Sequence, residues 1–589
     1  MVPIQQELER LGKVVESDVL VIGAGIGGCC SAITAKESGL VDEVVLIEKS
    51  YAGRTGPSAL VGGVFPAILP EDDLDATLRS FAEGGDYLMD QDISERLIRL
   101  GSQAFKSLEK WGIRFVKTAD GEYVTVFERG GKSFLCEGGG IPMMKSLTNY
   151  SRKIGVKIIN WTMITDLLVA DSSIIGAVGI NCRTAEFIVF KAKATILATG
   201  GTVFKSRQPG HRNTTGDGWA IAHRAGVEMM GFDYGKPNVY GATLEVGPGN
   251  GLMLSQGARL LNNKMEEYAK NYPEIAKQNS PEWHTPLMAM EAKRGNAPPI
   301  WLDLRHFTEQ QVDMIYRSVP YAARRWEKLG FIEGKRFVKL CEYAPEGPRP
   351  WGGVFVNPEF ASRNISGVFA CGEAVSKLQC GANLYRATVS GIISGESAAR
   401  AASEIDKVEV DAKAVMELNK VTMAPLERQE GIDPENALTT LQEAIHPYPV
   451  HILRREKDMQ KALAEVERVR DTIVPYLRAY DPHYLRLVHE LRNMVLCAEM
   501  HLRSMLERKE SRFGALREDY PYLDNANWLK WIFIKKGVGT GKMKIWTEHI
   551  PADRYKFKPK NEMSLHPFWA RAAELGYLKP SEAMQSHGN

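Results

Sequence analysis

Three glycines near the start of the chain have the spacing G-x-G-x-x-G. Gly23, Gly25 and Gly28 follow an apolar run at residues 18–22 and precede a predicted helix. In a strand–turn–helix the first glycine permits a tight turn, the second lets a pyrophosphate approach the backbone, and the third lets helix and strand pack closely. Glu48 ends the next apolar run about 20 residues later, where a carboxylate accepts hydrogen bonds from a ribose 2′-hydroxyl. The stretch therefore predicts a dinucleotide-binding site.

Two later segments indicate which dinucleotide is bound. Residues 194–201 are an apolar run that ends in Thr-Gly-Gly, and residues 365–374 are another that ends in Gly-Glu. They are similar to the segments that close the FAD site in flavoproteins with two dinucleotide-binding domains. In those proteins the second segment places an acidic side chain, here Glu373, near the ribityl chain. The resemblance favours FAD over NAD.

The composition is that of an ordinary enzyme. The chain has 589 residues and a formal net charge of +2, a length that suffices for about three or four domains. The near-balance of charge gives no reason to expect a nucleic acid or a membrane surface as the main partner. The eight cysteines include no C-x-x-C pair, so we expect no metal site and no iron–sulfur cluster held by this chain alone. Residues 1–17 lack the apolar stretch of a signal peptide, and no later segment approaches the length of a membrane span. We therefore expect a cytoplasmic protein without direct membrane insertion.

Seven segments, in order along the chain, are similar to those of one flavoprotein family. The chain resembles the flavoprotein subunits of succinate dehydrogenase and fumarate reductase, a family that includes L-aspartate oxidase and the α subunit of adenylylsulfate reductase. The segments that carry the resemblance are the glycine turn and residues 61–66, 82–92, 197–201 with 213–226, 351–357, 367–374 with 381–399, and 510–528.

The resemblance implies an α/β fold: a Rossmann-like FAD-binding domain (three-layer ββα) with an inserted capping domain and a C-terminal helical bundle. Periodicity supports the bundle independently, because residues 456–480 and 484–510 place apolar residues at three- and four-residue steps with charges between them. We expect the basic residues of these segments to face solvent. The last segment, rich in Lys, Pro and aromatic residues, predicts an extended chain over the body or a partner. The expected parts are residues 1–232 and 351–405 for the FAD-binding domain, 233–350 for the capping domain, 406–530 for the helical domain and 531–589 for a C-terminal extension.

The same resemblance, together with the glycine turn, predicts which residues bind the cofactor. They are Gly23, Gly25, Ile26, Gly27, Gly28, Glu48, Lys49, Thr55, Gly62, Gly63, Thr199, Gly200, Asp217, Gly372, Glu373 and Val389. Several members of the family attach FAD covalently through a histidine. Alignment on Arg54 and on Gly62–Gly63 places Gly56 at that position. We therefore expect non-covalent FAD.

The substrate site departs further from the family. Fumarate-type members use a histidine before proline in the capping region, an E-x-x-R-G proton-delivery stretch, a histidine before the returning Gly-Gly, and an arginine directly after Gly-Ala-Asn. The aligned positions here are Lys236, Gly251, Leu254, Pro348 and Leu384. Succinate dehydrogenase, fumarate reductase and L-aspartate oxidase activities are therefore each disfavoured.

Cationic residues near these positions are candidates to replace that machinery. The alignment brings Lys236, Arg349 and Arg386 together near the flavin. Cations in a water-poor pocket need an anionic partner to offset their desolvation. A carboxylate, phosphate or sulfate on the substrate would supply it, with arginine giving bidentate contacts. Lys236 would also serve as an acid or base if burial lowered its pKa. Alternatively, these cations pair with the FAD pyrophosphate or with protein carboxylates, for which the candidates are Asp233, Glu245 and Glu137.

The remaining candidates rest on weaker signals. Tyr240 and Glu137 lie in segments that face the flavin in relatives, and His211 lies on a loop beside the cofactor in the family, but each is equally compatible with an ordinary structural role. The candidate catalytic residues are Lys236, Arg349, Arg386 and Tyr240.

These observations favour an FAD-dependent oxidoreductase whose flavin N5 exchanges hydride with a small, anionic organic substrate. Because the chain has no cluster ligands, we expect electrons to pass to or from a separate ferredoxin-like or other iron–sulfur protein, and we expect no nucleic-acid partner. One alternative is an α subunit like that of adenylylsulfate reductase, whose substrate would suit a cationic pocket. Another is a non-catalytic subunit whose FAD relays electrons within a larger redox complex.

Overall fold

A seven-stranded sheet carries the candidate site. The computed structural model describes residues 4–66, 72–128, 131–208, 210–235, 239–241, 250–273, 281–381, 383–512, 514–537 and 542–577. The strand order is β6-β2-β1-β9-β8-β7, with β18 paired to β9. β6, β2, β1, β9 and β18 are parallel, and β8 and β7 continue the sheet in antiparallel pairing. The bounds are β1 Lys13–Ile22, β2 Val44–Ile47, β6 Lys157–Ile159, β7 Thr162–Ala170, β8 Ser173–Asn181, β9 Phe187–Leu197 and β18 Val368–Ala370.

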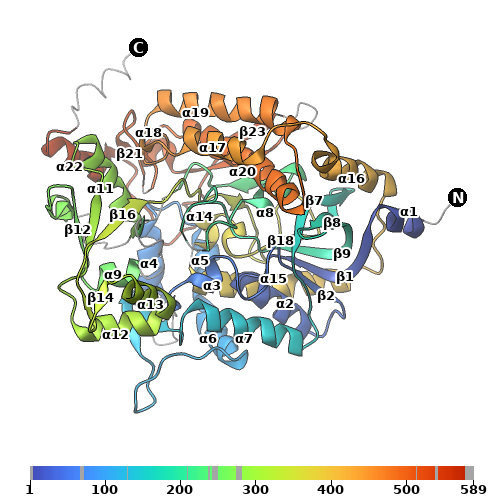
Figure 1. Ribbon diagram of the computed structural model, residues 1–589, viewed down its shortest axis with the longest axis horizontal. Helices are drawn as coiled ribbons and strands as arrows, with labels where there is room; N and C mark the ends of the chain where they lie inside the picture. Colours follow the sequence, from blue (N-terminus) through green and yellow to red (C-terminus); the bar gives the residue numbers. More distant parts are fainter. Residues whose placement is uncertain are drawn as a thin grey trace.

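The central strands are apolar because both faces of this sheet are covered. Residues 19–22 of β1 and all of β2 are buried, as expected for parallel strands packed on both sides. Three helices, α2 (Ile26–Glu37), α7 (Gly140–Lys153) and α15 (Leu384–Ser403), pack next to one another. Figure 1 shows α2 and α15 beside β1 and β2. The predicted α/β fold of this region is confirmed.

A second sheet lies in the part of the chain between the two halves of the FAD-binding region. Its order is β11-β16-β13-β12, and every pair is antiparallel. Helices α11, α12 and α13 and the aromatic residues Tyr268 and Trp326 contribute to the core beneath it. Its elements are β11 Val239–Gly241, α9 Asn250–Ser255, β12 Arg259–Leu261, α11 Pro281–Lys293, β13 Ile300–Asp303, α12 Glu309–Ser318, α13 Pro320–Lys328 and β16 Cys341–Pro345.

The two chain crossings into this inserted part lie side by side. Gly235 and Pro350 form an antiparallel bridge, and the Trp351 N–H donates to the Tyr234 oxygen at 2.9 Å. A buried arginine, Arg508, holds the first crossing by donating to Asp233 Oδ2 at 2.5 Å. The chain thus enters and leaves the inserted part at neighbouring points.

Helices dominate the chain after the returning part. α16 (Ala412–Glu427), α17 (Pro434–Ile445), α19 (Glu456–Arg468) and α20 (Pro482–Glu507) pack together, and α17, α19 and α20 lie along the top of Figure 1. α20 is buried along most of its length. The predicted helical C-terminal region is confirmed, whereas the domain boundaries predicted from the sequence stay predictions.

The end of the chain is more ordered than the predicted extended segment. β22 (Lys530–Lys536) and β23 (Met543–His549) form a hairpin, and β22 also pairs with β10 (Met229–Met230), which pairs with β17 (Gly353–Val354). α22 (Pro567–Glu574) packs Phe568 and Trp569 into the core of the inserted part. The physical reason is the burial of these apolar side chains, which composition alone did not reveal.

Shorter elements complete the described chain. They are α1 Ile4–Leu11, α3 Pro57–Leu60, β3 Val64–Pro66, α4 Leu74–Gly84, α5 Gln91–Arg99, α6 Gly101–Lys110, β4 Thr125–Glu128, β5 Gly131–Leu135, α8 Asp217–Arg224, β14 Ile332–Glu333, β15 Arg336–Phe337, α14 Lys377–Cys380, α18 Tyr448–His451, β19 Leu453–Arg454, β20 Leu516–Arg517, β21 Tyr522–Asp524, α21 Asn525–Trp528 and β24 Met563–Leu565, together with short 3-10 or π turns at Tyr268–Asn271, Gly372–Ala374, Val469–Ile473 and Val474–Tyr476.

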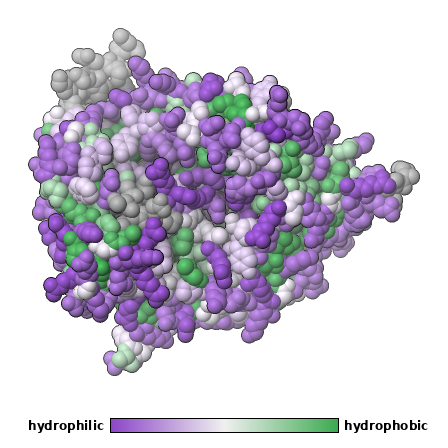
Figure 2. Space-filling model, in the orientation of Figure 1, coloured by the Kyte–Doolittle hydropathy of each residue, from purple (hydrophilic) through white to green (hydrophobic). Residues whose placement is uncertain are grey.

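The surface is mostly polar on the face seen in Figure 2, where apolar residues form scattered small patches. Within the described residues, every helix is too short or too polar to cross a bilayer.

Candidate functional site

A long cleft opens at the carboxyl ends of β1, β2 and β9, where ligands bind in doubly wound α/β folds. It encloses about 1060 Å³, including the part that is open to solvent. Predicted cofactor residues that line it are Gly23, Gly25, Ile26, Gly27, Glu48, Lys49, Thr55, Thr199, Gly200, Asp217, Gly372 and Glu373. These positions come from segments up to 350 residues apart in sequence, from Gly23 to Glu373.

Two glycines of the turn, Gly23 and Gly28, leave no room for a side chain. Gly23 has φ +107°, and a Cβ there would lie 2.5 Å from the Ala198 oxygen. A Cβ on Gly28 would lie 1.8 Å from the Gly23 oxygen, so this glycine closes the turn without lining the cleft. α2 begins after Gly25 without a side-chain cap. The Ile26 N–H donates to Ser58 Oγ at 3.2 Å, so the N–H groups that follow it in the first turn are the ones available to an anion in the cleft.

Glu48 is fixed by the backbone of the turn. Its Oε2 accepts a hydrogen bond from the Ala24 N–H at 3.1 Å, and its Oε1 accepts one from the Ser50 N–H at 3.0 Å. Each carboxylate oxygen has a second lone pair, and the residue lines the cleft. Glu48 therefore has the position and the acceptor capacity for a ribose hydroxyl.

A buried ion-pair network supports the floor of the cleft. Lys49 Nζ lies 2.8 Å from Asp217 Oδ2 and 2.8 Å from Glu490 Oε1, and Lys205 reaches the other oxygen of Glu490 at 2.5 Å. Burial alone would raise the pKa of Glu490, but Lys49 and Lys205 outweigh it and hold this pKa at about 2. Sequence reasoning missed Glu490, because the sequence of this helix gives no sign of the two lysines that pair with its carboxylate.

Glu373 is held by two cations at the other end of the cleft. Arg349 Nη2 lies 3.1 Å from Glu373 Oε1, and Lys377 Nζ lies 3.6 Å from the same oxygen. Burial would raise the pKa of Glu373, but Lys377 and Arg349 lower it to about 2. The ionised carboxylate thus neutralises Arg349. The sequence alternative of a protein carboxylate partner fits Arg349, although the partner is none of the three carboxylates considered.

His211 joins this region from the loop after β9. Its Nδ1 makes a short hydrogen bond to Glu346 Oε1, and both side chains are buried. Burial raises the pKa of Glu346, but the charges of His211 and Arg349 outweigh burial and leave this pKa below its ordinary value. Of the weaker candidates, His211 is therefore part of a charged cluster, whereas Glu137 forms an exposed ion pair with Arg114 at 3.2 Å.

Arg386 has a different environment. Its guanidinium lies over the Phe81 ring, 4.1 Å from the centroid, and the residue is only 4% exposed. Its Nη1 has no hydrogen-bond partner, and within the described residues no carboxylate lies within ion-pair distance. Burial lowers the pKa of Arg386 accordingly. The residue sits in the first turn of α15, next to Ala387, which lines the cleft.

Several predicted positions lie elsewhere. Val389 is buried in the core and, like Gly62 and Gly63, lies outside the lining of the cleft. The Gly62 oxygen instead accepts a hydrogen bond from Ser318 Oγ at 2.8 Å. Lys236 and the side chain of Tyr240 lie outside the described residues, so the expected convergence with Arg349 and Arg386 stays a prediction for them.

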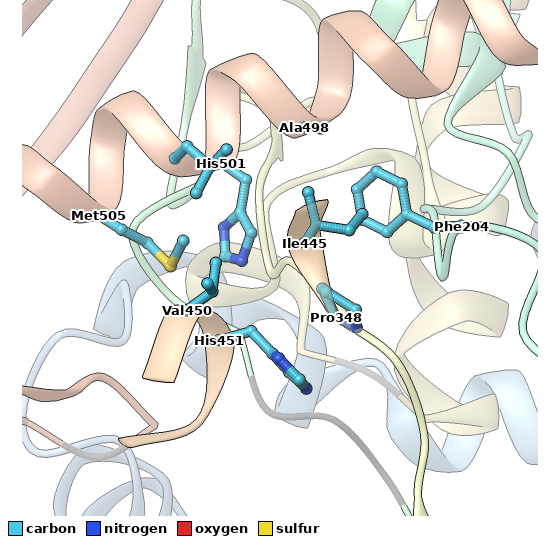
Figure 3. A pocket seen from close by; sticks show the side chains of 9 residues that line it. Phe204, Pro348, Ile445, Val450, His451, Ala498, His501 and Met505 are labelled. Carbon is cyan, nitrogen blue, oxygen red and sulfur yellow. The ribbon is translucent and has the colours of Figure 1, made fainter. Parts of the chain in front are cut away.

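A separate, small cavity lies where α20 and α18 face the second crossing of the inserted part. It leaves no room for a water molecule, and Figure 3 shows His501 and Met505 from one helix opposite His451 and Pro348. Burial lowers the pKa of His451 and of His501 to about 3. The lining is apolar around two neutral imidazoles, which fits packing of the helices better than a ligand site. Its residues are Phe204, Pro348, Ile445, Val450, His451, Ala498, His501, Leu502 and Met505.

The donors of the large cleft fit the predicted cofactor. A side-chain-free turn with available N–H groups suits a pyrophosphate, and an acceptor at Glu48 suits a ribose. Gly56 also lines the cleft and offers no side chain for a covalent bond.

Comparison with known proteins agrees with this assignment. A family model described as FAD binding domain matches residues 18–387, and one described as fumarate reductase flavoprotein C-term matches residues 439–563. A fumarate reductase flavoprotein subunit of Haemophilus influenzae is 28% identical over 570 residues, which is 88% of this chain and 92% of that protein. Among solved structures, E. coli quinol fumarate reductase has a TM-score of 0.82 at 21% identity, covering 93% of this chain and 98% of that one. Adenosine-5-phosphosulfate reductase in complex with sulfite has a TM-score of 0.77 at 24% identity, covering 92% and 97%. The two structural likenesses concern the fold.

Proposed function

Because this chain belongs to the succinate dehydrogenase and fumarate reductase flavoprotein family and is an FAD-dependent oxidoreductase, we propose that it exchanges hydride between flavin and a small anionic organic substrate. When bound, FAD supplies the hydride chemistry, and the protein supplies orientation and electrostatics. The glycine turn would hold the pyrophosphate and Glu48 the adenosine ribose, while Glu373 would lie near the ribityl chain. With Gly56 at the position of the family's histidine, FAD is bound non-covalently.

The observation that carries the anionic substrate is the guanidinium of Arg386, whose Nη1 lacks a hydrogen-bond partner and which has no carboxylate at ion-pair distance among the described residues. A buried cation without a counterion is costly, and in proteins such groups are paired or bind anions. Arg349, in contrast, already has Glu373 as its partner. We therefore assign recognition of the substrate's carboxylate, phosphate or sulfate to Arg386. Lys236 and Tyr240 stay proposals for the same site, since their side chains lie outside the described residues.

The electrons need a route away from the flavin. The sequence has no C-x-x-C pair, so the proposal includes a separate iron–sulfur protein, such as a ferredoxin-like subunit. This part rests on the family resemblance and names no specific partner.

An anaerobic spectroscopic assay tests the substrate proposal. Purified holoenzyme is titrated with dicarboxylates, hydroxy acids, phosphorylated acids and sulfonates while the flavin absorbance is recorded, first oxidised and then after reduction with a viologen dye. We expect at least one anionic compound to change the flavin redox state. Loss of a charged hydrogen bond costs about 1.5–3 kcal/mol, so Arg386→Gln should raise the KM of that compound about 10- to 150-fold. The matched control is Arg207→Gln, an exposed residue on the loop after β9.

Two outcomes would contradict the proposal. If the flavin responds only when a redox protein is added, the chain is an electron relay without a substrate of its own. If a neutral compound is the substrate and Arg386→Gln leaves its KM unchanged, the role of Arg386 is wrong. The adenylylsulfate alternative is one arm of the same assay, in which reduced enzyme and adenylylsulfate would have to release sulfite and AMP.

A further inference from the structure

Lys377 is a buried lysine for which neither the sequence analysis nor the proposed reaction has a role. It begins α14, is 1% exposed, and is fixed by its own backbone, since its N–H donates to the Trp351 oxygen at 2.8 Å. Its Nζ shares one oxygen of Glu373 with Arg349, at 3.6 Å and 3.1 Å respectively. Glu373 in turn lines the cleft. The carboxylate of Glu373 therefore contacts both cations, Arg349 and Lys377, and also faces the cleft.

Lys377 and Arg349 share the single carboxylate of Glu373. Glu346, the other carboxylate that acts on Lys377, is bonded to His211. On the opposite side of α14, the buried carboxyl of Asp90 accepts a hydrogen bond from Gln379 at 3.1 Å. The proton on Lys377 is thus only partly compensated.

The protonation of Lys377 is consequently sensitive to any charge added to the cleft. Burial lowers the pKa of Lys377 to about 8. The charge of Glu373 acts in the opposite direction and raises this pKa, whereas the charge of Arg349 lowers it further. A negative charge added on the far side of Glu373 favours the protonated lysine. The coupling is reciprocal, so protonation of Lys377 in turn stabilises that negative charge.

We propose that Lys377 is a redox-linked proton site, which in alkaline solution takes up one proton when FAD in the adjoining cleft is reduced and releases it on oxidation. Reduction delivers two electrons and one proton to the flavin, which leaves one additional negative charge in the cleft. Lys377 binds a second proton from solvent and offsets that charge. The electrons come from any reductant of the holoenzyme, and no substrate is needed. The inference rests on FAD occupying the cleft beside Glu373, and it is independent of the anionic substrate.

Direct proton counting on the unmodified holoenzyme tests this site. The protein is reduced anaerobically in weakly buffered solution by an electrochemical mediator, and proton uptake per flavin is measured with a pH indicator. At about pH 7 Lys377 is protonated in both states, so uptake should be about one proton. Between about pH 8 and 9.5 it should rise towards two. Uptake that stays at about one proton throughout this range would overturn the proposal.

Variants assign the second proton to its residue. Lys377→Met and Lys377→Arg should both remove the rise, the first because no proton is bound and the second because the guanidinium remains charged. The flavin potential of Lys377→Arg should match that of the unmodified enzyme at low pH, whereas Lys377→Met should be harder to reduce. The control is Lys535→Met. Lys535 lies in β22 and pairs with Glu228, and its removal should leave the rise in proton uptake unchanged. His211→Gln should also retain it, and loss of the rise in that variant alone would assign the proton to His211 and refute the proposal.

Discussion

Replacing Glu490 by Gln should destabilise the protein and weaken its hold on FAD. Glu490 is fully buried and receives Lys49 at 2.8 Å and Lys205 at 2.5 Å, with the lysine side chains 12% and 17% exposed. Among the described residues, its removal leaves Lys205 without an ion-pair partner and Lys49 with Asp217 alone, and it takes away the carboxylate that lies 3.9 Å from Arg486. Breaking a buried pair by removing one partner costs about 3–5 kcal/mol.

The lowered pKa of Glu490 gives a second measure of how much its ion pairs contribute to the free energy of unfolding. A shift from 4.5 to about 2 corresponds to about 3 kcal/mol of stability. This contribution is present above the unfolded pKa and is lost as pH falls from about 4.5 towards 2, because the unfolded chain binds the proton first. Glu490→Gln should therefore be less stable near neutral pH and should lose less stability on acidification than the unmodified chain.

Urea unfolding at fixed FAD concentration, followed by tryptophan and flavin fluorescence, measures both effects. A double-mutant cycle with Lys205→Met should give a coupling energy of about 1–3 kcal/mol. The matched control is Glu465→Gln on α19, whose ion pair with Arg468 is exposed and should contribute at most about 1 kcal/mol. If Glu490→Gln behaves like this control, or if its acid dependence is unchanged, the buried network does not have the role assigned to it.

Three further predictions follow from single contacts. Gly28→Ala places a methyl group 1.8 Å from the Gly23 oxygen, so the purified variant should be colourless, and a normal flavin spectrum would contradict the turn geometry. Trp569→Ala removes a buried indole that donates to Ser511 Oγ at 2.9 Å and should cost about 3–5 kcal/mol in urea unfolding; a loss below about 1 kcal/mol would show that α22 is not part of the core. His451 has a pKa of about 3 because it is buried, so the unfolded chain binds its proton first as pH falls below about 6.5. His451→Gln should accordingly flatten the loss of stability between about pH 6.5 and 4, and an unchanged pH profile would mean that this imidazole is solvated.

Local sequence patterns predict much of the cofactor site. The glycine turn, the strand before it and the carboxylate at Glu48 are set by backbone sterics and by a short, fixed spacing, and such features are readable from sequence. The helix α20 could be predicted from its periodicity for the same reason. The burial of Glu490 in that helix could not be predicted, because its ion pairs are with Lys49 and Lys205, which lie hundreds of residues earlier.

The substrate half depends on long-range pairing. Arg349 and Arg386 were both expected to be open to a substrate anion, yet Arg349 is neutralised by Glu373 and only Arg386 lacks a carboxylate within the described residues. Lys377 was missed because a lysine in a short helix has no motif, and its importance comes from sharing an oxygen with Arg349. Val389, predicted as a cofactor ligand from its segment, lies in the core because its position in α15 turns it towards the sheet-packed interior.

The bridge between Gly235 and Pro350 means that the inserted part enters and leaves the main body through neighbouring points. The inserted part is also held by the far end of the chain, because Phe568 and Trp569 of α22 pack into its core. Removing the insertion would therefore leave two paired chain ends at Gly235 and Pro350 but would expose the apolar face of α22, so the insertion and α22 have to be exchanged together.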